Sequence, residues 1–192
     1  LQDSTLFRRT FCYTQATSDT LELHEPTLRL LFEKHSMAEK SVNVGSMGTS
    51  KAGASDTMLS VAEWISLCQG CGFIDEDLSL DDAKLIFAWS RMRVVDEDSA
   101  VSRMRVENLN WHSFLEAVVR VAQSKALPTD AQVAAAGCAD GGEFLFKMRE
   151  EDPSAYDAFL ATHDKGWWMP MVHQTIADAI RHLLMLVSRT IM

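Results

Sequence analysis

The sequence predicts an all-α fold in which two similar helix–loop–helix units are followed by extra C-terminal helices. Apolar residues recur every three or four positions over most of the chain, and no alternating apolar and polar run exceeds about four residues. Helix-start signals are frequent, for example Ser79 before two acidic residues and Asp152 before Pro153. The stretches "MLSVAEW" and "ENLNWHSF" also share one layout, in which a single apolar residue precedes a helix that opens near an aromatic residue.

Composition divides the chain into four segments. Residues 1–25 are polar without a clear period and predict an N-terminal arm. Residues 26–127 contain both helix–loop–helix units and predict one domain. Residues 128–141 predict a linker, because Ala, Gly and Asp break the periodic pattern there. Residues 142–192 predict a C-terminal helical region that packs on or next to the domain.

The predicted helices are placed by their apolar faces and their end signals. A helix over residues 25–36 has Pro26 in its first turn, and Gly72 ends the helix that carries both closely spaced cysteines. Long loops are predicted over residues 37–57 and 93–108. The remaining helices are predicted over residues 61–71, 79–92, 110–126, 142–151, 152–163 and 170–189.

The composition limits the classes of partner. The chain has 192 residues, of which 47% are hydrophobic, and its formal net charge is -9. Binding to nucleic acid or to an anionic membrane is not expected, because both need a positive surface. No apolar run approaches the roughly 20 residues that span a bilayer. Four cysteines in a chain of this length do not resemble a secreted disulfide framework, so we expect a cytoplasmic protein.

The two units fit the skeleton of a paired EF-hand. In such a pair the eighth loop residue is aliphatic and forms a short β-bridge with its twin, and the twelfth is Glu. Leu59 and Leu109 fit the eighth position, and an aromatic residue follows each twelfth position. The twelfth residues are Glu63 and Ser113, so only the first unit keeps the carboxylate. We therefore predict a degenerate paired EF-hand-like domain.

The calcium ligands of an EF-hand are largely missing from both loops. Calcium needs six or more oxygen ligands and a glycine at the sixth loop position. Counting back from Glu63 places Ala52 and Ala54 at ligand positions. The acidic run in the second loop fits only in a register that puts Arg103 at the aliphatic position, so a solvated loop is the favoured interpretation. The metal candidates that remain are Asp96, Asp98, Glu107 and Glu63.

The stretch "WISLCQGCGFID" resembles a signature of the tubulin polymerization-promoting protein family. The matching residues are Trp64, Leu67, Cys68, Cys71, Ile74 and Asp75, with Phe87, Leu109, Trp111, Phe114 and Ala117 further along. The resemblance covers residues 27–123 or thereabouts. It implies an EF-hand-like α-domain that does not depend on calcium, in proteins that bind and bundle microtubules.

The cysteine pair of this signature admits a metal, a redox and a packing interpretation. A structural zinc site needs four ligands, and Cys12 and Cys138 lie far away in the predicted arm and linker. A redox pair is favoured at the N-terminus of a helix, whereas this pair is at the C-terminal end. Packing is therefore preferred, and no metal or cofactor is expected. The predicted core residues are Trp64, Leu67, Cys68, Cys71, Phe87 and Phe114.

Two further groups of residues are candidates for partner binding. The arginines of the second loop could form a positive patch, although internal pairing with the acidic residues there is the more common arrangement. A tryptophan pair before the last helix could either fix that helix to the core or anchor a partner. The candidates are Arg91, Arg93, Arg103, Arg105, Trp167 and Trp168.

These observations favour a protein-interaction module without enzymatic activity. The sequence contains no glycine-rich phosphate loop, no His-Glu-x-x-His motif and no nucleophile elbow. The resemblance places the module in the microtubule cytoskeleton, including a ciliary or flagellar context, with tubulin or a microtubule-associated assembly as partner. The alternatives are a calcium-responsive regulator of EF-hand type and an accessory subunit of a large assembly unrelated to tubulin.

Overall fold

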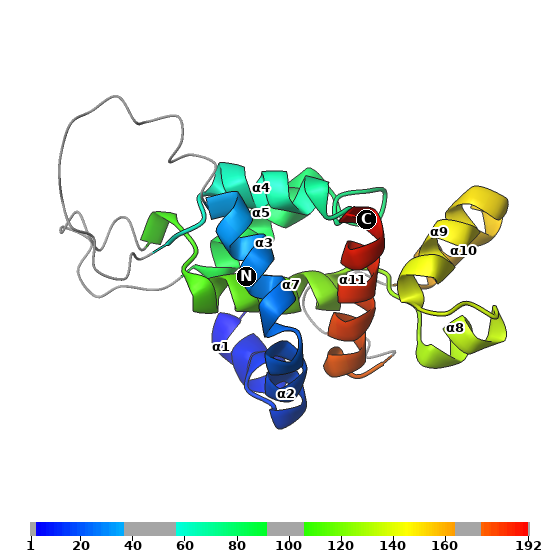
Figure 1. Cartoon of the computed structure of the whole chain (residues 1–192), viewed down its shortest axis with the longest axis horizontal. Coiled ribbons are helices and arrows are strands. Elements are labelled where there is room, and N and C mark those ends of the chain that lie inside the picture. Colours follow the sequence, from blue (N-terminus) through cyan, green and yellow to red (C-terminus); the bar gives the residue numbers. More distant parts are fainter. Residues whose placement is uncertain (1–2, 37–56, 92–105, 164–173, 192) are drawn as a thin grey trace.

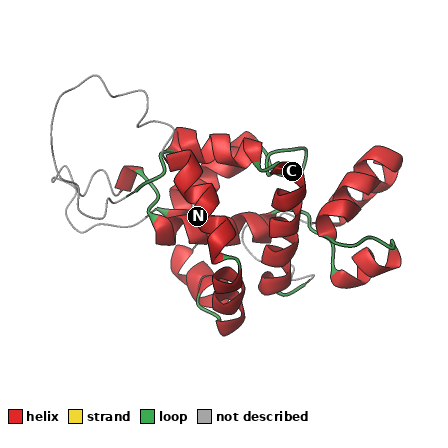
Figure 2. Cartoon of the chain, viewed as in Figure 1, coloured by secondary structure: helices red, strands yellow, loops and turns green. Residues whose placement is uncertain are grey.

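The computed structural model describes residues 3–36, 57–91, 106–163 and 174–191, and confirms the all-α prediction (Figure 2). Within these residues the chain is helical apart from turns, loops and one isolated β-bridge. Figure 1 shows the arrangement of the elements. They are α1 Ser4–Phe7, the π-helical segment η1 Arg8–Cys12, α2 Gln15–Leu23, α3 Glu25–Ser36, α4 Val61–Gly70, α5 Leu80–Ser90, α7 Trp111–Ser124, α8 Asp130–Ala135, α9 Gly141–Glu151, α10 Pro153–Thr162 and α11 Ile176–Ile191.

The single β-bridge joins the two helix–loop–helix units at the predicted residues. Leu59 and Leu109 exchange both backbone hydrogen bonds, each with an N···O distance of 2.8 Å, in antiparallel orientation. The next residue in each unit, Ser60 or Asn110, is the N-cap of the following helix, α4 or α7. Both units therefore begin their second helix in the same way, directly after the bridge.

The interior of the two units contains the core residues expected from the sequence. Trp64 and Phe114, which follow the two twelfth loop positions, meet edge to face with ring centroids 6.4 Å apart. The indole Nε1 of Trp64 donates to the carbonyl of Ala83 at 2.9 Å, so this large ring is buried with its polar atom satisfied. All six predicted core residues are buried: Trp64, Leu67, Cys68, Cys71, Phe87 and Phe114.

Helix α11, red in Figure 1, lies between α7 and α9. It packs against α7, α9 and α2. Six of its apolar residues recur at helical spacing and lie in the core: Ala179, Ile180, Leu183, Leu184, Leu186 and Val187. Within the described residues, none of the helices combines the length and the apolar character that crossing a lipid bilayer requires.

The N-terminal region differs from the predicted arm over residues 1–25. Its described part forms α1, η1 and α2, and η1 packs on α7. The ring of Phe7 is buried and lies 4.1 Å from the guanidinium carbon of Arg120. The start of each α-helix is capped by a side chain, Asp3 for α1 and Thr14 for α2. The N-terminal region thus docks through η1 on α7 and through α2 on α11.

The predicted linker over residues 128–141 also contains a helix. Thr129 and Gln132 form a capping box at the start of α8, and Asp140 caps α9. Helices α9 and α10 then form a hairpin at the edge of the molecule, beyond α11 in Figure 1. Phe144 and Phe159 hold the hairpin together, with ring centroids 5.6 Å apart.

The hairpin is seated on α11 through a glycine at a point of close approach. A Cβ at Gly141 would lie 2.5 Å from Nδ1 of His182, so any larger residue would collide with the buried imidazole. The other ring nitrogen, Nε2, lies 3.0 Å from an oxygen of Asp130 but is not oriented for a hydrogen bond. Burial and then the charge of Arg181 lower the pKa of His182, so the fold favours its neutral form.

A second attachment links the hairpin to Asp75, the last residue of the stretch "WISLCQGCGFID". One oxygen of Asp75 accepts from Nζ of Lys125 at 2.7 Å and from Nη2 of Arg149 at 2.8 Å. Its other oxygen accepts from the backbone N–H groups of Asp77 and Leu78. Asp75 thus joins a tight turn, α7 and α9.

Candidate functional site

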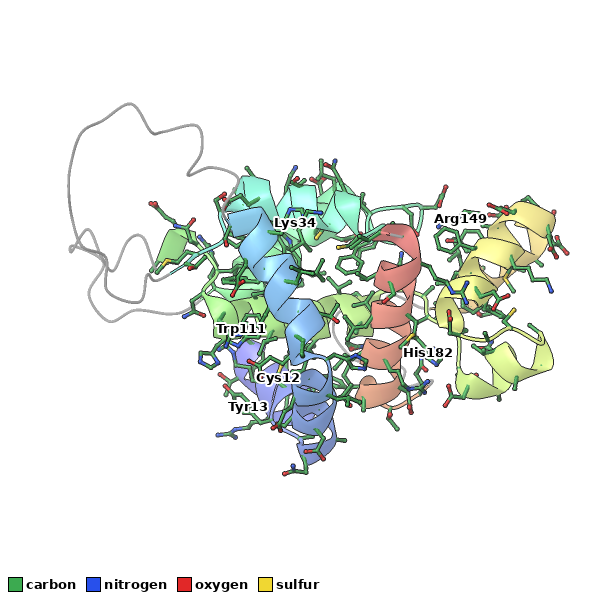
Figure 3. All side chains as sticks on the ribbon, viewed as in Figure 1. Cys12, Tyr13, Lys34, Trp111, Arg149 and His182 are labelled. Carbon is green, nitrogen blue, oxygen red and sulfur yellow. The ribbon has the colours of Figure 1, made fainter. Side chains whose placement is uncertain are left out.

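A cleft lies between the N-terminal helices and α7, and it is the main candidate for a functional site. Its volume is about 680 Å³, within the range of small binding pockets. Its described walls come from η1, α2, the start of α3, the last residue of α5 and the first half of α7. Three of its residues are labelled in Figure 3, where Cys12 and Tyr13 lie next to Trp111.

One wall of the cleft contains Arg8 and Glu116, which belong to a cluster of two arginines around one carboxylate. Glu116 accepts from Nε of Arg8 at 2.7 Å, and from Nε and Nη2 of Arg120 at 3.0 and 2.7 Å. Arg120 is only 2% exposed and stacks on Phe7. Both oxygens of Glu116 are therefore engaged, and the wall is held in place by charge-assisted hydrogen bonds.

The opposite side of the cleft is formed by the start of α3 and by α2. Glu25 pairs with Arg29 at 3.1 Å, and the guanidinium of Arg29 lies 3.8 Å from the ring centroid of Trp111. This contact joins α3 to the start of α7. Glu22 on α2 is exposed and makes no ion pair with a described residue. Glu22 is therefore the carboxylate of this cleft that remains available to a ligand.

Ser90, at the end of α5, gives the cleft a buried polar group without a partner. The residue is 1% exposed and lines the cleft, and its hydroxyl makes no hydrogen bond with a described residue. A buried polar atom usually has a hydrogen-bond partner, because losing water without replacement costs free energy.

Cys12 lines the same cleft but is not placed for thiol chemistry. Burial and then the charge of Glu116 raise the pKa of Cys12 to about 12. A nucleophilic cysteine needs the thiolate, so at neutral pH this thiol remains protonated. The arrangement of the cleft favours binding through shape, charge and hydrogen bonds.

Of the metal candidates of the sequence, the structure describes Glu63 and Glu107, and neither belongs to a group of side chains that could hold a metal ion. The carboxylate of Glu63 accepts from the backbone N–H of Ser60 at 2.7 Å and closes a capping box at the start of α4. Glu107 is exposed on the surface. Asp96 and Asp98 lie outside the described residues. The part of the chain that the structure describes has no group of three or more His, Cys, Asp or Glu side chains placed to hold a metal ion.

The cysteine pair occupies the core, as the packing interpretation predicts. Cys68 and Cys71 are both buried, and Gly72 has a φ of 69°, the left-handed conformation expected after a helix end. Burial raises the pKa of both thiols, to about 12 for Cys71. The pair therefore behaves as a pair of small hydrophobic side chains.

Most partner-binding candidates of the sequence fall outside the described residues: Arg93, Arg103, Arg105, Trp167 and Trp168. Arg91 is described at the end of α5, half-buried next to Ser90. Its Nε is buried and makes no hydrogen bond within the described part of the chain. The positive patch and the tryptophan anchor stay predictions.

The cleft was not predicted from the sequence, because it depends on the docking of the N-terminal helices. A usable signal exists: Asp3 and Thr14 are good N-cap residues, and both cap a helix here.

Comparison of the sequence with family models, with curated proteins and with solved structures found no match.

Proposed function

We propose that this protein is a non-enzymatic interaction module built on a paired EF-hand-like core that does not depend on calcium. The observation that carries the proposal is the bridge between Leu59 and Leu109, which joins two helix–loop–helix units capped in the same way. In a paired EF-hand the same element couples the two loops. In this chain it is accompanied by a fully buried aromatic contact between Trp64 and Phe114.

Independence from calcium is supported by the two residues at the twelfth loop positions, Glu63 and Ser113. Glu63, the one carboxylate at a twelfth loop position, is mostly buried and bonded to the backbone of its own helix. Ser113 at the matching position offers no bidentate carboxylate. The helix starts are therefore stabilised without an ion.

Isothermal titration with calcium tests this part of the proposal. We expect no binding tighter than roughly 10 μM, the weak end of the sensor range, and no change in the near-UV circular dichroism spectrum on adding calcium. Tighter binding would favour the calcium-responsive regulator instead.

The microtubule context of the proposal rests on the resemblance of the signature that ends at Asp75. Tubulin tails are acidic, so a basic surface would help binding. Most described cations are paired inside the chain, whereas Arg9, Lys34 and Lys147 are exposed and have no ion-pair partner among the described residues. Electrostatics then contributes little to this interaction, and we expect it to depend only weakly on salt.

Co-sedimentation with microtubules at a low and a high salt concentration tests the context. We expect the protein to pellet with microtubules at both. Absence from the pellet at low salt would refute the microtubule role and would favour an accessory subunit of another assembly.

A further inference from the structure

We infer that the cleft between η1, α2 and α7 is a docking site for a partner segment that inserts a large apolar side chain and carries a basic residue beside it. The inference rests on the proposed role as an interaction module, and it adds the surface and the chemistry of the partner. It does not depend on whether that partner is tubulin.

The apolar part of the inference follows from the walls of the cleft. Leu21, Leu115 and Trp111 line it and are only partly buried, so apolar surface stays in contact with water. Val119 lies behind them in the core. A volume of about 680 Å³ leaves room for one or two large side chains. Their burial would be favourable at about 25 cal/mol per Å² of apolar surface.

The basic part of the inference follows from the charges around the cleft. Glu116 is ion-paired with Arg8 and Arg120, and Glu25 is paired with Arg29. Glu22 is the carboxylate in the described lining that has no ion-pair partner, and it is exposed. The net charge of -9 adds a long-range attraction for a positive segment.

Two further groups indicate a polypeptide occupant. The unpartnered hydroxyl of Ser90 can bond to a backbone amide or carbonyl of an inserted segment. Tyr13 lines the cleft and is 73% exposed, an unusual exposure for a large aromatic ring in a free surface. Tyrosine is enriched at protein interfaces, where its ring buries apolar area and its hydroxyl remains bonded.

A selection from a random peptide library displayed on phage, with the full chain immobilised, tests the inference. We expect the enriched peptides to carry Lys or Arg within one helical turn of Phe, Leu, Trp or Met. One enriched peptide, labelled with a fluorophore, is then titrated with the protein by fluorescence anisotropy.

Variants of the cleft and a matched control complete the experiment. Glu22→Lys reverses the free charge, and we expect it to weaken peptide binding about tenfold. Tyr13→Ala removes the exposed ring and is expected to weaken binding to a similar extent, about tenfold. Glu33→Lys makes the same charge change on an exposed residue of α3 outside the cleft and should leave binding unchanged. All three positions are exposed, and far-UV circular dichroism confirms that each variant is folded.

The inference is refuted if no peptide is enriched, if the enriched peptides lack a basic or a large apolar residue, or if Glu22→Lys and Glu33→Lys bind equally well. These outcomes are separate from those of the proposed function. A protein that fails to pellet with microtubules but selects such peptides has this docking site and a different partner. A protein that pellets but selects none has no such site in this cleft.

Discussion

Replacing Asp75 by Asn is expected to destabilise the protein strongly, although the two side chains have almost the same shape. Asn keeps an oxygen for the backbone N–H groups of Asp77 and Leu78, so the turn is preserved. It removes the negative charge that faces Lys125, whose side chain is only 2% exposed. The substitution therefore isolates the ion pair.

The magnitude follows from burial. Removing one partner of a buried ion pair leaves an uncompensated charge and typically costs about 3–5 kcal/mol. The loss of the contact with Arg149 adds little, because that side chain is 45% exposed. We expect a decrease of about 3 kcal/mol in the free energy of unfolding, which is a large part of the 5–15 kcal/mol typical of a domain.

The assay is urea unfolding followed by far-UV circular dichroism at neutral pH. Glu76→Gln is the matched control, since Glu76 is the next residue, has a 70% exposed side chain and lies 3.8 Å from the same Arg149. We expect it to change stability by less than about 0.5 kcal/mol. Adding Lys125→Met to Asp75→Asn should recover part of the loss, because the buried charge is then gone. A free energy of unfolding of Asp75→Asn within about 1 kcal/mol of that of the unchanged protein would refute the stabilising role of the Asp75–Lys125 ion pair.

Three further predictions concern the hairpin and the core. Gly141→Ala should lower the free energy of unfolding by about 1–3 kcal/mol because its Cβ meets His182. Gly70→Ala should raise it by up to about 1 kcal/mol, because its Cβ would meet only Cε1 of His35 at 4.0 Å, an ordinary van der Waals contact; urea unfolding of both variants decides. The pKa of His182 is lower in the folded than in the unfolded chain, so the free energy of unfolding should fall as pH drops below about 6.5. His182→Gln should flatten the plot of this free energy against pH between about pH 7 and pH 5. An unchanged slope would contradict the lowered pKa of His182. A thiol reagent should modify Cys138 in the folded protein but reach Cys68 only on unfolding, as measured by mass spectrometry; rapid labelling of Cys68 would contradict its burial.

The helices of the two units could be predicted because their signals are local. Ser79 and Asp152 are N-caps as expected, and Gly72 ends its helix in the left-handed conformation. The bridge between Leu59 and Leu109 was also predictable, although the residues are far apart, since both sit just before a helix that opens in the same way. The local sequence was sufficient to predict a helix where a capping residue stands at the start of a stretch with helical apolar periodicity.

The cleft could not be predicted because it is made by contacts between distant segments. Arg8 reaches Glu116, and Phe7 stacks on Arg120, so the docking of the N-terminal helices depends on α7. The apolar residues of the segment are few, with Phe7 and Phe11 as the main pair, which is why the region resembles an arm. The burial of the Ser90 hydroxyl without a hydrogen-bond partner among the described residues likewise depends on the helices around it and has no signal in the sequence.

The central position of α11 has a consequence for synthesis of the chain. On the ribosome α2, α7 and α9 emerge first, and the surfaces that they present to α11 are without cover until residues 176–191 have been made. Exposed apolar surface on a nascent chain favours aggregation. We therefore expect newly made chains to require chaperone protection until this helix emerges.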